Sequence, residues 1–407
     1  MSDTKKIHGQ FDPAQPIQDF LVFGEFGDVN PSITDSSTYT FLSAEKMEEL
    51  FEHEIEGCFL YSRHWNPINR YLSQALAGME STESAIVTSS GMAAISCSIL
   101  QFCSSGDEVV ASRTIYGGTY ALFKNFLPKL GITVRFVNMT DLDAVKSAIN
   151  ANTKIIYCES VSNPLLEVVN LPKLSKLAHS HNLKLIVDNT FSPLMISPAV
   201  HGADIIVHSL TKFINGTSDC VAGCICTSHE NVEALTNINS GASMLLGPVL
   251  DSYRAASILK NLHSLHLRVT QHSANALYIA QQLENLGLKV FYPGLKSYKH
   301  YNLMTAIMNK KYGFGGMLAL DCGTPEKADE LMVAMQNNKV GYLAVSLGYF
   351  KTLFSSPGHS TSSEIPPEER DAMGLSDGLV RFSIGLDNNI ELSFSRIKKG
   401  LEEVGLI

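Results

Sequence analysis

Short runs of β-forming residues alternate with segments of helical spacing from about residue 65 onward. The runs fall at 85–87, 108–111, 134–137, 155–158, 185–187, 205–207 and 221–225. Between several of them apolar residues recur at helical spacing, as at Leu171, Leu174, Leu177 and Ala178. This alternation predicts an α/β fold, with a mostly parallel seven-stranded sheet and helices on both faces. Since right-handed crossovers bring the carboxyl ends of such strands to one edge, we expect a small ligand there.

The first 55 residues have a different pattern. Proline and glycine interrupt them repeatedly, and only residues 44–51 have apolar residues at helical spacing. Such an arm is either disordered or packed on a neighbouring subunit. Its apolar run at 20–23 (FLVF) favours packing, because disordered segments contain few large apolar side chains.

The last third of the chain predicts a second, smaller folded unit. A long helical pattern from about Ser252 to Leu286 leads into it. Beyond this helix, strand patterns occur at 290–292 and 317–321, and helical patterns at 326–336 and 390–404. We therefore expect an N-terminal arm (1–55), a larger α/β domain (56–250) and a smaller α+β C-terminal domain (251–407).

Composition and charge narrow the classes of function. Of the 407 residues, 45% are hydrophobic and 17% are charged, as in a well-packed globular protein. Acidic residues outnumber basic ones by 40 to 31, and no run of lysine or arginine forms a basic stripe. This balance argues against a nucleic-acid partner and against an anionic membrane surface. No stretch approaches the ~18 consecutive apolar residues of a membrane span.

The polar start and the cysteines predict a cytoplasmic protein. No apolar signal core follows the first residues, MSDTKK. Eight scattered cysteines indicate free thiols in a reducing compartment. Cys220, Cys224 and Cys226 are close enough in sequence to suggest a metal site, but no fourth ligand stands at a useful spacing. We expect ordinary buried thiols there, and no metal.

The glycine motifs do not predict a nucleotide site. The nearest G-x-G run is GFGG at 313–316, but no strand pattern precedes it and no helical pattern opens after it. A dinucleotide fingerprint needs both. The sequence also has no P-loop and no G-x-S-x-G elbow.

Two predicted strands end in residues that can carry chemistry. The run at 185–187 ends in Asp188, and HSLTK follows the run at 205–207, which puts Lys212 at the same sheet edge. A strand-end carboxylate alone is often an exposed cap, but a lysine in such a place is rarely tolerated without a function. Pyridoxal 5′-phosphate (PLP) needs this pair, an amine for an imine and a carboxylate to keep the pyridine nitrogen protonated. The pair predicts a PLP enzyme in which Lys212 holds the cofactor as a Schiff base.

The phosphate of such a cofactor also has a candidate site. The run SSGMAA at 89–94 follows a strand pattern and opens a helical one. Its free backbone N–H groups and the helix dipole would suit an anion, and Gly91 would allow close approach. A plain serine-capped helix explains the same run without a ligand. Ser209 and Thr211 would add hydroxyl donors.

Taken together, these motifs resemble the Cys/Met-metabolism PLP-dependent enzymes, the family of cystathionine γ-synthase, cystathionine γ-lyase and methionine γ-lyase. The resemblance extends from about residue 28 to the C-terminus, with DNT at 188–190 and SLTK at 209–212 in the family's order. Within the family, the runs are most similar to plant-type methionine γ-lyases. The supporting runs are EFG at 25–27, YSRH at 61–64, GASMLLGP at 241–248 and STSSE at 360–364. The resemblance implies the fold type I of PLP-dependent transferases.

The resemblance also implies roles for the residues around the cofactor. Lys212 would form the imine and then move protons between Cα and Cβ of the substrate, while Asp188 would pair with the pyridine nitrogen. Tyr116 would lie over the ring and act as the acid for the departing sulfur. The phosphate would be held by Ser90, Gly91, Met92, Ser209 and Thr211.

Other implied roles reach beyond one chain or concern the substrate. Tyr61 and Arg63 would contact the cofactor phosphate of a neighbouring subunit, so that a site is complete only in a homodimer, within an expected homotetramer. Arg381 would bind the substrate carboxylate, helped by Asn163 and Ser346, because a guanidinium matches a carboxylate with two parallel hydrogen bonds. Without the order of motifs in the family, each residue taken singly is better explained structurally, Arg63 and Arg381 as surface charges and Tyr116 as an aromatic at the edge of the core.

Four positions bear on the substrate. Cystathionine-using relatives commonly have Glu before the Tyr-Ser-Arg run and before the Ser-Leu-Gly run, where this chain has Leu60 and Val345. An apolar pair suits the methyl group of a thioether and leaves a distal ammonium without a partner. Two departures affect the comparison. Val161 stands where the family often has Pro, and Gly118 where bacterial methionine γ-lyases have Cys after Tyr-Gly.

Three functions follow from these observations. The first is methionine γ-lyase, which converts L-methionine to methanethiol, 2-oxobutanoate and ammonia. The second keeps the cofactor chemistry and changes the sulfur amino acid, as in cystathionine γ-lyase, cystathionine γ-synthase or O-acetylhomoserine sulfhydrylase. The third is a PLP-binding protein without activity, which the joint presence of Lys212, Asp188, Tyr116 and Arg381 disfavours.

Overall fold

The structure is a computed structural model of the chain. It describes residues 11–22, 24, 27–41, 43–52, 55, 57–359, 368, 370 and 373–407. Part of the run at 20–23, part of the EFG run at 25–27 and the whole STSSE run at 360–364, all used in the sequence analysis, lie outside these residues.

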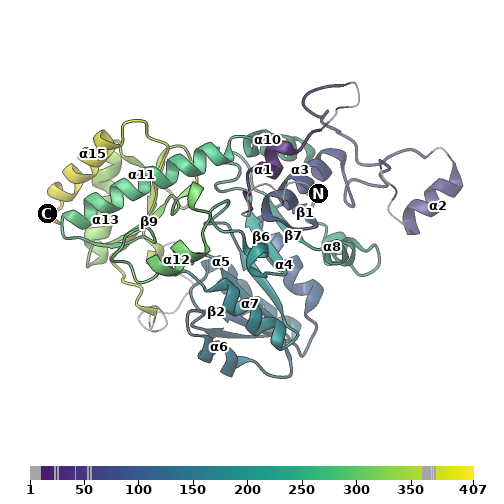
Figure 1. Ribbon diagram of the computed structural model, residues 1–407, viewed down its shortest axis with the longest axis horizontal. Helices are drawn as coiled ribbons and strands as arrows, with labels where there is room; N and C mark the ends of the chain where they lie inside the picture. Colours follow the sequence, from purple (N-terminus) through teal and green to yellow (C-terminus); the bar gives the residue numbers. More distant parts are fainter. Residues whose placement is uncertain are drawn as a thin grey trace.

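A seven-stranded sheet is the larger of two sheets (Figure 1), with strand order β1-β7-β6-β5-β4-β2-β3. Neighbouring strands from β6 to β3 pair in parallel, while β7 runs antiparallel to both β6 and β1. The mostly parallel sheet is therefore confirmed, although β7 begins and ends two residues later than its predicted run. The strands are β1 (Ser84–Thr88), β2 (Glu108–Ser112), β3 (Thr133–Val137), β4 (Thr153–Glu159), β5 (Lys184–Asp188), β6 (Ile205–Ser209) and β7 (Gly223–Thr227).

Helices cover both faces of this sheet. Because both faces are buried, its strands are nearly continuous apolar runs, which is why the sequence pattern identified them. One face packs against α3 (Pro67–Glu80), α6 (Leu142–Ala148), α7 (Leu171–Ser180) and α10 (Ser252–Leu262). The other packs against α4 (Gly91–Phe102), α5 (Gly117–Ala121), α8 (His229–Thr236) and α9 (Ala242–Leu246).

A smaller five-stranded sheet follows in the C-terminal part, on the left of Figure 1. Its order is β10-β11-β12-β9-β8, and only β10 and β11 pair in parallel. Helices α11, α13 and α15 bury apolar residues against this sheet. The elements are β8 (Lys289–Phe291), β9 (Met317–Asp321), β10 (Gly341–Leu343), β11 (Thr352–Ser355), β12 (Leu379–Ser383), α11 (Leu265–Asn285), α12 (Tyr301–Ile307), α13 (Pro325–Asn337) and α15 (Ile390–Glu403).

The predicted single helix from Ser252 to Leu286 was wrong, because the chain forms two helices, α10 and α11, with a break at residues 263–264. The side chain of Arg268 stabilises the break. Its guanidinium donates to the Asn261 carbonyl at 2.9 Å and to Ser264 Oγ at 3.1 Å, so side-chain contacts satisfy polar groups where the helix ends. The strands β10, β11 and β12 and the helices α1 and α12 were not predicted.

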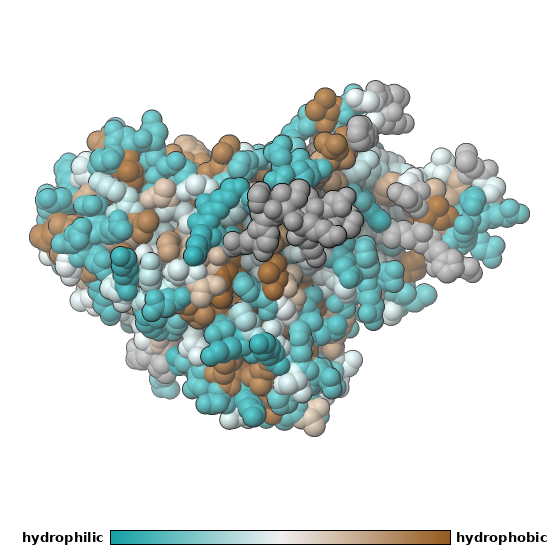
Figure 2. Space-filling view, in the orientation of Figure 1, coloured by the Kyte–Doolittle hydropathy of each residue, from teal (hydrophilic) through white to brown (hydrophobic). Residues whose placement is uncertain are grey.

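The N-terminal arm contains α1 (Gln15–Asp19) and α2 (Ala44–Glu52), and Figure 1 shows α2 at the end of a projection from the body. Hydrophobic groups are exposed on this projection among hydrophilic ones (Figure 2), and Val29 is 94% exposed. Within the described part of the chain, no helix has both the length and the apolar character needed to cross a bilayer. All eight cysteines are free thiols, and Cys220, Cys224 and Cys226 are buried as predicted.

Candidate active site

A cavity of about 260 Å³ opens where the carboxyl ends of β1, β2, β4, β5 and β6 meet. The cavity is therefore at the sheet edge where the strand pattern predicted a ligand. The smaller sheet contributes to its wall through β12 and the segment before β11. Its lining residues are Ser90, Gly91, Met92, Ile95, Tyr116, Glu159, Val161, Asn163, Asp188, Thr190, Phe191, Ser209, Thr211, Lys212, Val221, Val345, Leu347 and Arg381.

Asp188, the last residue of β5, is held in place by hydrogen bonds. The Thr190 N–H donates to its Oδ1 at 2.9 Å, and the Tyr157 hydroxyl lies 3.5 Å from its Oδ2. Burial raises the pKa of Asp188, and the bonds from Thr190 oppose that rise. Thr190 also accepts the Ser209 N–H at 2.9 Å, so it fixes the end of β5 relative to the end of β6.

Lys212 lies in the turn that follows β6. Its Nζ donates to Ser346 Oγ at 3.2 Å, which brings the predicted substrate residue Ser346 to the amine. Desolvation by burial, and then the charge of Arg381, lower the pKa of Lys212 from 10.5 to about 8. An amine with this pKa is neutral in an appreciable fraction of molecules at neutral pH and can act as a nucleophile or base.

The start of α4 forms one wall of the cavity. Ser90 caps the helix, since its Oγ accepts the Ala93 N–H at 3.0 Å, and the first N–H groups of the helix have no intrahelical acceptor. Gly91 packs tightly on β6, because a Cβ added to it would lie 2.8 Å from Ser209 Cβ. The Thr211 hydroxyl bonds to both backbone groups of Ala222, at 3.0 and 3.3 Å.

Arg381 extends from the middle of β12 and is only 2% exposed. Its Nη1 donates to Asn163 Oδ1 at 3.0 Å, and its Nη2 donates to Ser355 Oγ at 3.4 Å. Burial lowers the pKa of Arg381 to about 10. It remains a cation at neutral pH, so a guanidinium with spare donors lines a cavity in which an anion would find a partner.

Glu159, at the end of β4, is a cavity residue to which the sequence analysis gave no role. Its Oε1 accepts the Tyr116 N–H and its Oε2 accepts the Asn163 N–H, each at 2.7 Å. The signal that could have identified it is the one that identified Asp188, a carboxylate at the end of an apolar strand. Thr190, Phe191, Val221 and Leu347 were also missed.

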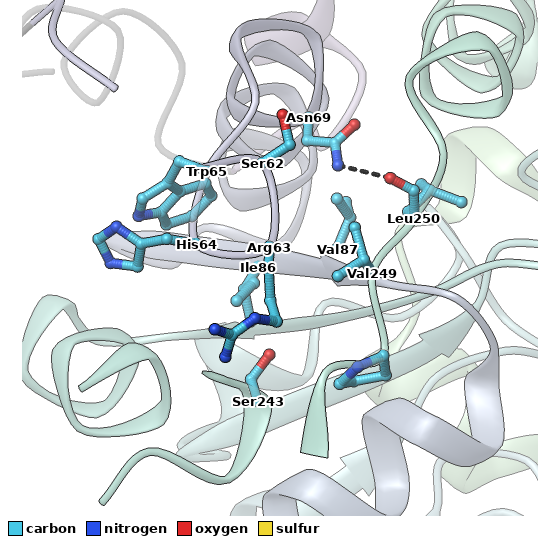
Figure 3. Close-up of a pocket in the computed structure, with 11 residues that line it drawn as sticks. Ser62, Arg63, His64, Trp65, Asn69, Ile86, Val87, Ser243, Val249 and Leu250 are labelled. Carbon is cyan, nitrogen blue, oxygen red and sulfur yellow. Dashed lines mark hydrogen bonds between the residues drawn. The ribbon is translucent and has the colours of Figure 1, made fainter. Parts of the chain in front are cut away.

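Four predicted residues, Leu60, Tyr61, Arg63 and Ser346, do not line this cavity, although Ser346 contacts the cavity residue Lys212. Arg63 instead lines a small separate pocket with residues such as Trp65 and Ser243 (Figure 3). Its Nη1 donates to the Met244 carbonyl at 2.8 Å. Within one chain, the predicted residues of the site therefore divide into a set gathered at the cavity and a set that lies elsewhere.

The gathered residues fit PLP. An amine and a carboxylate, Lys212 and Asp188, line the same cavity, and a helix N-terminus next to Ser209 supplies donors for a phosphate. Only a glycine fits at position 91, because a Cβ there would meet Ser209, and this close packing brings the start of α4 next to the end of β6.

Comparisons with known proteins agree with this geometry. The Cys/Met metabolism PLP-dependent enzyme family model matches residues 20–402. A methionine gamma-lyase of Arabidopsis thaliana is 44% identical, over 95% of this chain and 90% of that protein. An L-methionine gamma-lyase of Fusobacterium nucleatum subsp. polymorphum is 38% identical, over 93% of this chain and 95% of that protein. The solved structure of a putative O-acetylhomoserine (thiol)-lyase from Campylobacter jejuni, which carries pyridoxyl-lysine-5′-monophosphate, is 28% identical with a TM-score of 0.88, covering 96% of this chain and 100% of that one.

Proposed function

Because the chain belongs to the Cys/Met metabolism PLP-dependent enzyme family, we propose that it is a methionine γ-lyase. Its cofactor is PLP and its fold is that of the PLP-dependent transferases of fold type I, so the expected cofactor and fold class are confirmed. The observation that carries the proposal is the single cavity in which Lys212, Asp188, Tyr116 and Arg381 meet. The reaction takes L-methionine and water to methanethiol, 2-oxobutanoate and ammonia.

The substrate is held at its carboxylate end. Arg381 binds the carboxylate with the guanidinium donors that face the cavity. Asn163 holds the guanidinium in position by accepting a hydrogen bond from it at 3.0 Å. Ser346, 3.2 Å from Lys212 Nζ, lies where it can donate to the same carboxylate. This placement puts the Cα proton of the substrate next to Lys212.

Lys212 and Tyr116 move the protons. When bound, PLP withdraws electrons from the substrate through its protonated ring, and Asp188 keeps that ring nitrogen protonated. Lys212 takes the proton from Cα, passes it on, and as a neutral amine again takes a proton from Cβ. Tyr116, 41% exposed at the cavity mouth, donates its hydroxyl proton to the sulfur as the bond between Cγ and sulfur breaks.

The apolar side chains near the cavity support methionine over cystathionine. Val345 lines the cavity, and we propose that Leu60 of a neighbouring chain faces the same end of the substrate. Cystathionine has a second ammonium group at that end, and an apolar wall would leave it without a partner. An unpaired buried group of this kind costs roughly 1–3 kcal/mol or more.

We further propose that Tyr61 and Arg63 complete the phosphate site of a second chain. The phosphate of PLP carries about −1.5 to −2 charge at neutral pH. Among the described residues that line the cavity, the cations are Lys212 and Arg381, which bind the cofactor aldehyde and the substrate carboxylate. The phosphate therefore needs a cation from elsewhere, and a guanidinium from a neighbouring chain supplies it.

Subunit mixing tests this sharing. Arg63→Ala and Lys212→Ala proteins should each be inactive or weak, and a mixed dimer has one site with both residues intact, so activity should return on mixing. Mixed dimers that form, as shown by differently tagged subunits, and stay inactive would contradict the sharing. The control mixes two differently tagged preparations of Arg63→Ala. Their mixed dimers have no site with Arg63 intact, so no activity should return.

We propose that the parts of the chain also determine the assembly. The proposed division is an arm (1–55), a PLP-binding domain (56–250) and a C-terminal domain (251–407), with the arm packed on a neighbouring subunit. Exposed apolar side chains on the arm, Leu21, Val29 and Met47, favour such packing. We propose a homotetramer built from two such dimers, and a cytoplasmic location in keeping with eight free thiols. Light scattering at several concentrations measures the assembly.

The function itself is tested by a panel of sulfur amino acids, scored for 2-oxobutanoate and for the thiol released. Methionine should give both products in equal amounts. Lys212→Ala should give neither, while Lys260→Ala, a matched change at an exposed position of α10, should act as wild type. Turnover of O-acetylhomoserine or cystathionine without turnover of methionine would assign the chain to another activity of the family.

A further inference from the structure

One carboxylate ties together two segments that are distant in sequence. Glu159 is 5% exposed, and its two oxygens are fully occupied by the N–H groups of Tyr116 and Asn163, both at 2.7 Å. Tyr116 lies at the end of the segment between β2 and α5, while Asn163 follows β4. Thr114 Oγ1 also donates to Glu167 Oε2 at 3.1 Å, so the two segments touch at a second place. Glu159 is the carboxylate that joins them at Tyr116 and Asn163.

A buried glutamate costs free energy unless hydrogen bonds or an opposite charge compensate for its lost hydration. Glu159 is paired in register with Asp188 on β5, so two carboxyl groups lie on neighbouring strands. Burial, and then Asp188, raise the pKa of Glu159 well above 4.5, while its two backbone hydrogen bonds and Arg381 oppose that rise. Glutamine would fill the same space without a second acidic group, but it has one acceptor oxygen, whereas the two N–H groups require two.

The two partners of Glu159 act on opposite ends of the substrate in the proposed reaction. Tyr116 lies at the cavity mouth, where the proposed acid for the sulfur is needed. Asn163 supports Arg381, which binds the substrate carboxylate in the proposed function. A shift of either N–H would move a side chain that has to stay within hydrogen-bonding reach of the substrate.

We propose that Glu159 is a positioning residue that holds Tyr116 and the Asn163–Arg381 pair in fixed relation across the cavity. The proposal rests on the proposed function and adds a residue to it. Glu159 itself neither transfers a proton nor binds the substrate carboxylate. It acts through the backbone of its two partners, so its loss should alter both amino-acid binding and the rate of the chemical step.

Binding of L-alanine to the PLP-loaded protein isolates one half of this effect. Alanine has the amine and the carboxylate of a substrate but no leaving group, and the absorbance change of the cofactor reports its binding. Glu159→Gln loses one acceptor and should weaken alanine binding by roughly tenfold or more, because a buried N–H is left facing the new amide N–H₂. With methionine, KM should rise and kcat should fall.

Glu108→Gln is the matched control. Glu108 is also 5% exposed and also belongs to the larger sheet, but it begins β2 at the opposite edge. Its carboxylate accepts hydrogen bonds from Arg135 and Asn150. Glu108→Gln should lower the melting temperature and leave alanine binding, PLP affinity and the ratio of kcat to KM unchanged. A merely structural Glu159 would behave in the same way.

A double-mutant cycle decides whether Glu159 acts through Asn163. Asn163→Ala should weaken alanine binding in wild type and have a smaller effect in Glu159→Gln, because the Asn163 side chain is already displaced there. Additive effects, or a folded Glu159→Gln that binds alanine as wild type does, would overturn the proposal. If Glu159→Gln does not fold, the rate of amide hydrogen exchange in the wild-type protein tests the two hydrogen bonds instead. The Tyr116 and Asn163 amides should then be protected like strand amides, and rapid exchange at both would overturn it.

The outcome can be separated from that of the proposed function. Alanine lacks the distal part of any sulfur substrate, so its binding does not depend on which one the enzyme prefers. A wild type that binds alanine and releases no 2-oxobutanoate from methionine would refute the methionine assignment and leave the role of Glu159 intact. A wild type that turns over methionine, with Glu159→Gln unchanged in binding and rate, would refute only the role of Glu159.

Discussion

Capture of PLP by the apoenzyme should depend on pH with a midpoint set by Lys212. Desolvation and the charge of Arg381 lower the pKa of Lys212 from 10.5 to about 8. The amine must be neutral to attack the aldehyde of PLP. At pH 7 roughly one molecule in ten is then reactive, against about one in three thousand for a lysine of pKa 10.5. The capture rate should therefore rise about tenfold per pH unit below pH 8 and level off above it.

Removing the neighbouring cation should move this midpoint in a known direction. A positive charge disfavours a protonated amine, so Arg381→Met should raise the pKa of Lys212 and shift the midpoint to higher pH. Desolvation is the larger cause and remains, so the midpoint should stay below 10.5. Arg254→Met, a matched change at an exposed residue of α10, should leave the midpoint where it is.

The assay is stopped-flow mixing of apoenzyme with PLP from about pH 6 to 10, followed by the visible absorbance of the bound cofactor. A simple amine measured in parallel corrects for the pH dependence of free PLP. A wild-type midpoint at about pH 10 or above would refute the account of the Lys212 environment. A midpoint that falls in Arg381→Met would refute the role given to the guanidinium.

Three further predictions follow from the contacts. Gly91→Ala should weaken PLP binding by roughly tenfold or more, because the new Cβ would lie 2.8 Å from Ser209 Cβ and push the start of α4 away from β6. Equilibrium dialysis measures the affinity for PLP. An unchanged Kd would contradict the importance of this close packing for the cofactor. Val345→Glu should move the ratio of kcat/KM for cystathionine over methionine upward by roughly tenfold, whereas an equal loss with both substrates would mean that Val345 only packs. Burial lowers the pKa of His208, but the charge and hydrogen bond of Glu80 at 2.7 Å, together with smaller contributions that include Asp188, raise it from 6.5 to about 8. A raised pKa stabilises the fold fully below pH 6.5, and that stabilisation is lost as pH rises through about 8. Glu80→Gln should thus lower the melting temperature more at about pH 6 than at about pH 9, and equal losses would contradict the ion pair.

The elements that the sequence predicted well are those whose burial is continuous along the chain. β5 and β6 are apolar runs because helices cover both faces of the sheet. The charged residues that follow these runs, Asp188 at the end of β5 and Lys212 in the turn after β6, therefore stood out in the sequence. β12 was missed because Arg381 stands in the middle of it, where a charge breaks the apolar run. That charge is buried because of its place at the cavity, and no local pattern shows this. β10 and β11 are too short to show a period.

The site divides in the same way. Asp188 and Lys212 could be inferred from the ends of neighbouring strands, whereas Tyr116 and Arg381 came only from the resemblance to a family. Glu159 carried the same strand-end signal as Asp188, but its partners are backbone N–H groups from segments 43 residues before it and four residues after it. Backbone donors leave no trace in residue type, so their convergence on one carboxylate becomes visible only in three dimensions.

A competition between L-methionine and L-cystathionine tests the proposed preference of this PLP enzyme for methionine. Both substrates are offered together to the purified protein, and methanethiol and cysteine are measured as the two different thiol products. Methanethiol should be released faster at equal substrate concentrations, because the apolar wall that includes Val345 accepts a methyl group and leaves a distal ammonium unpaired. Cysteine as the faster product would contradict the methionine assignment.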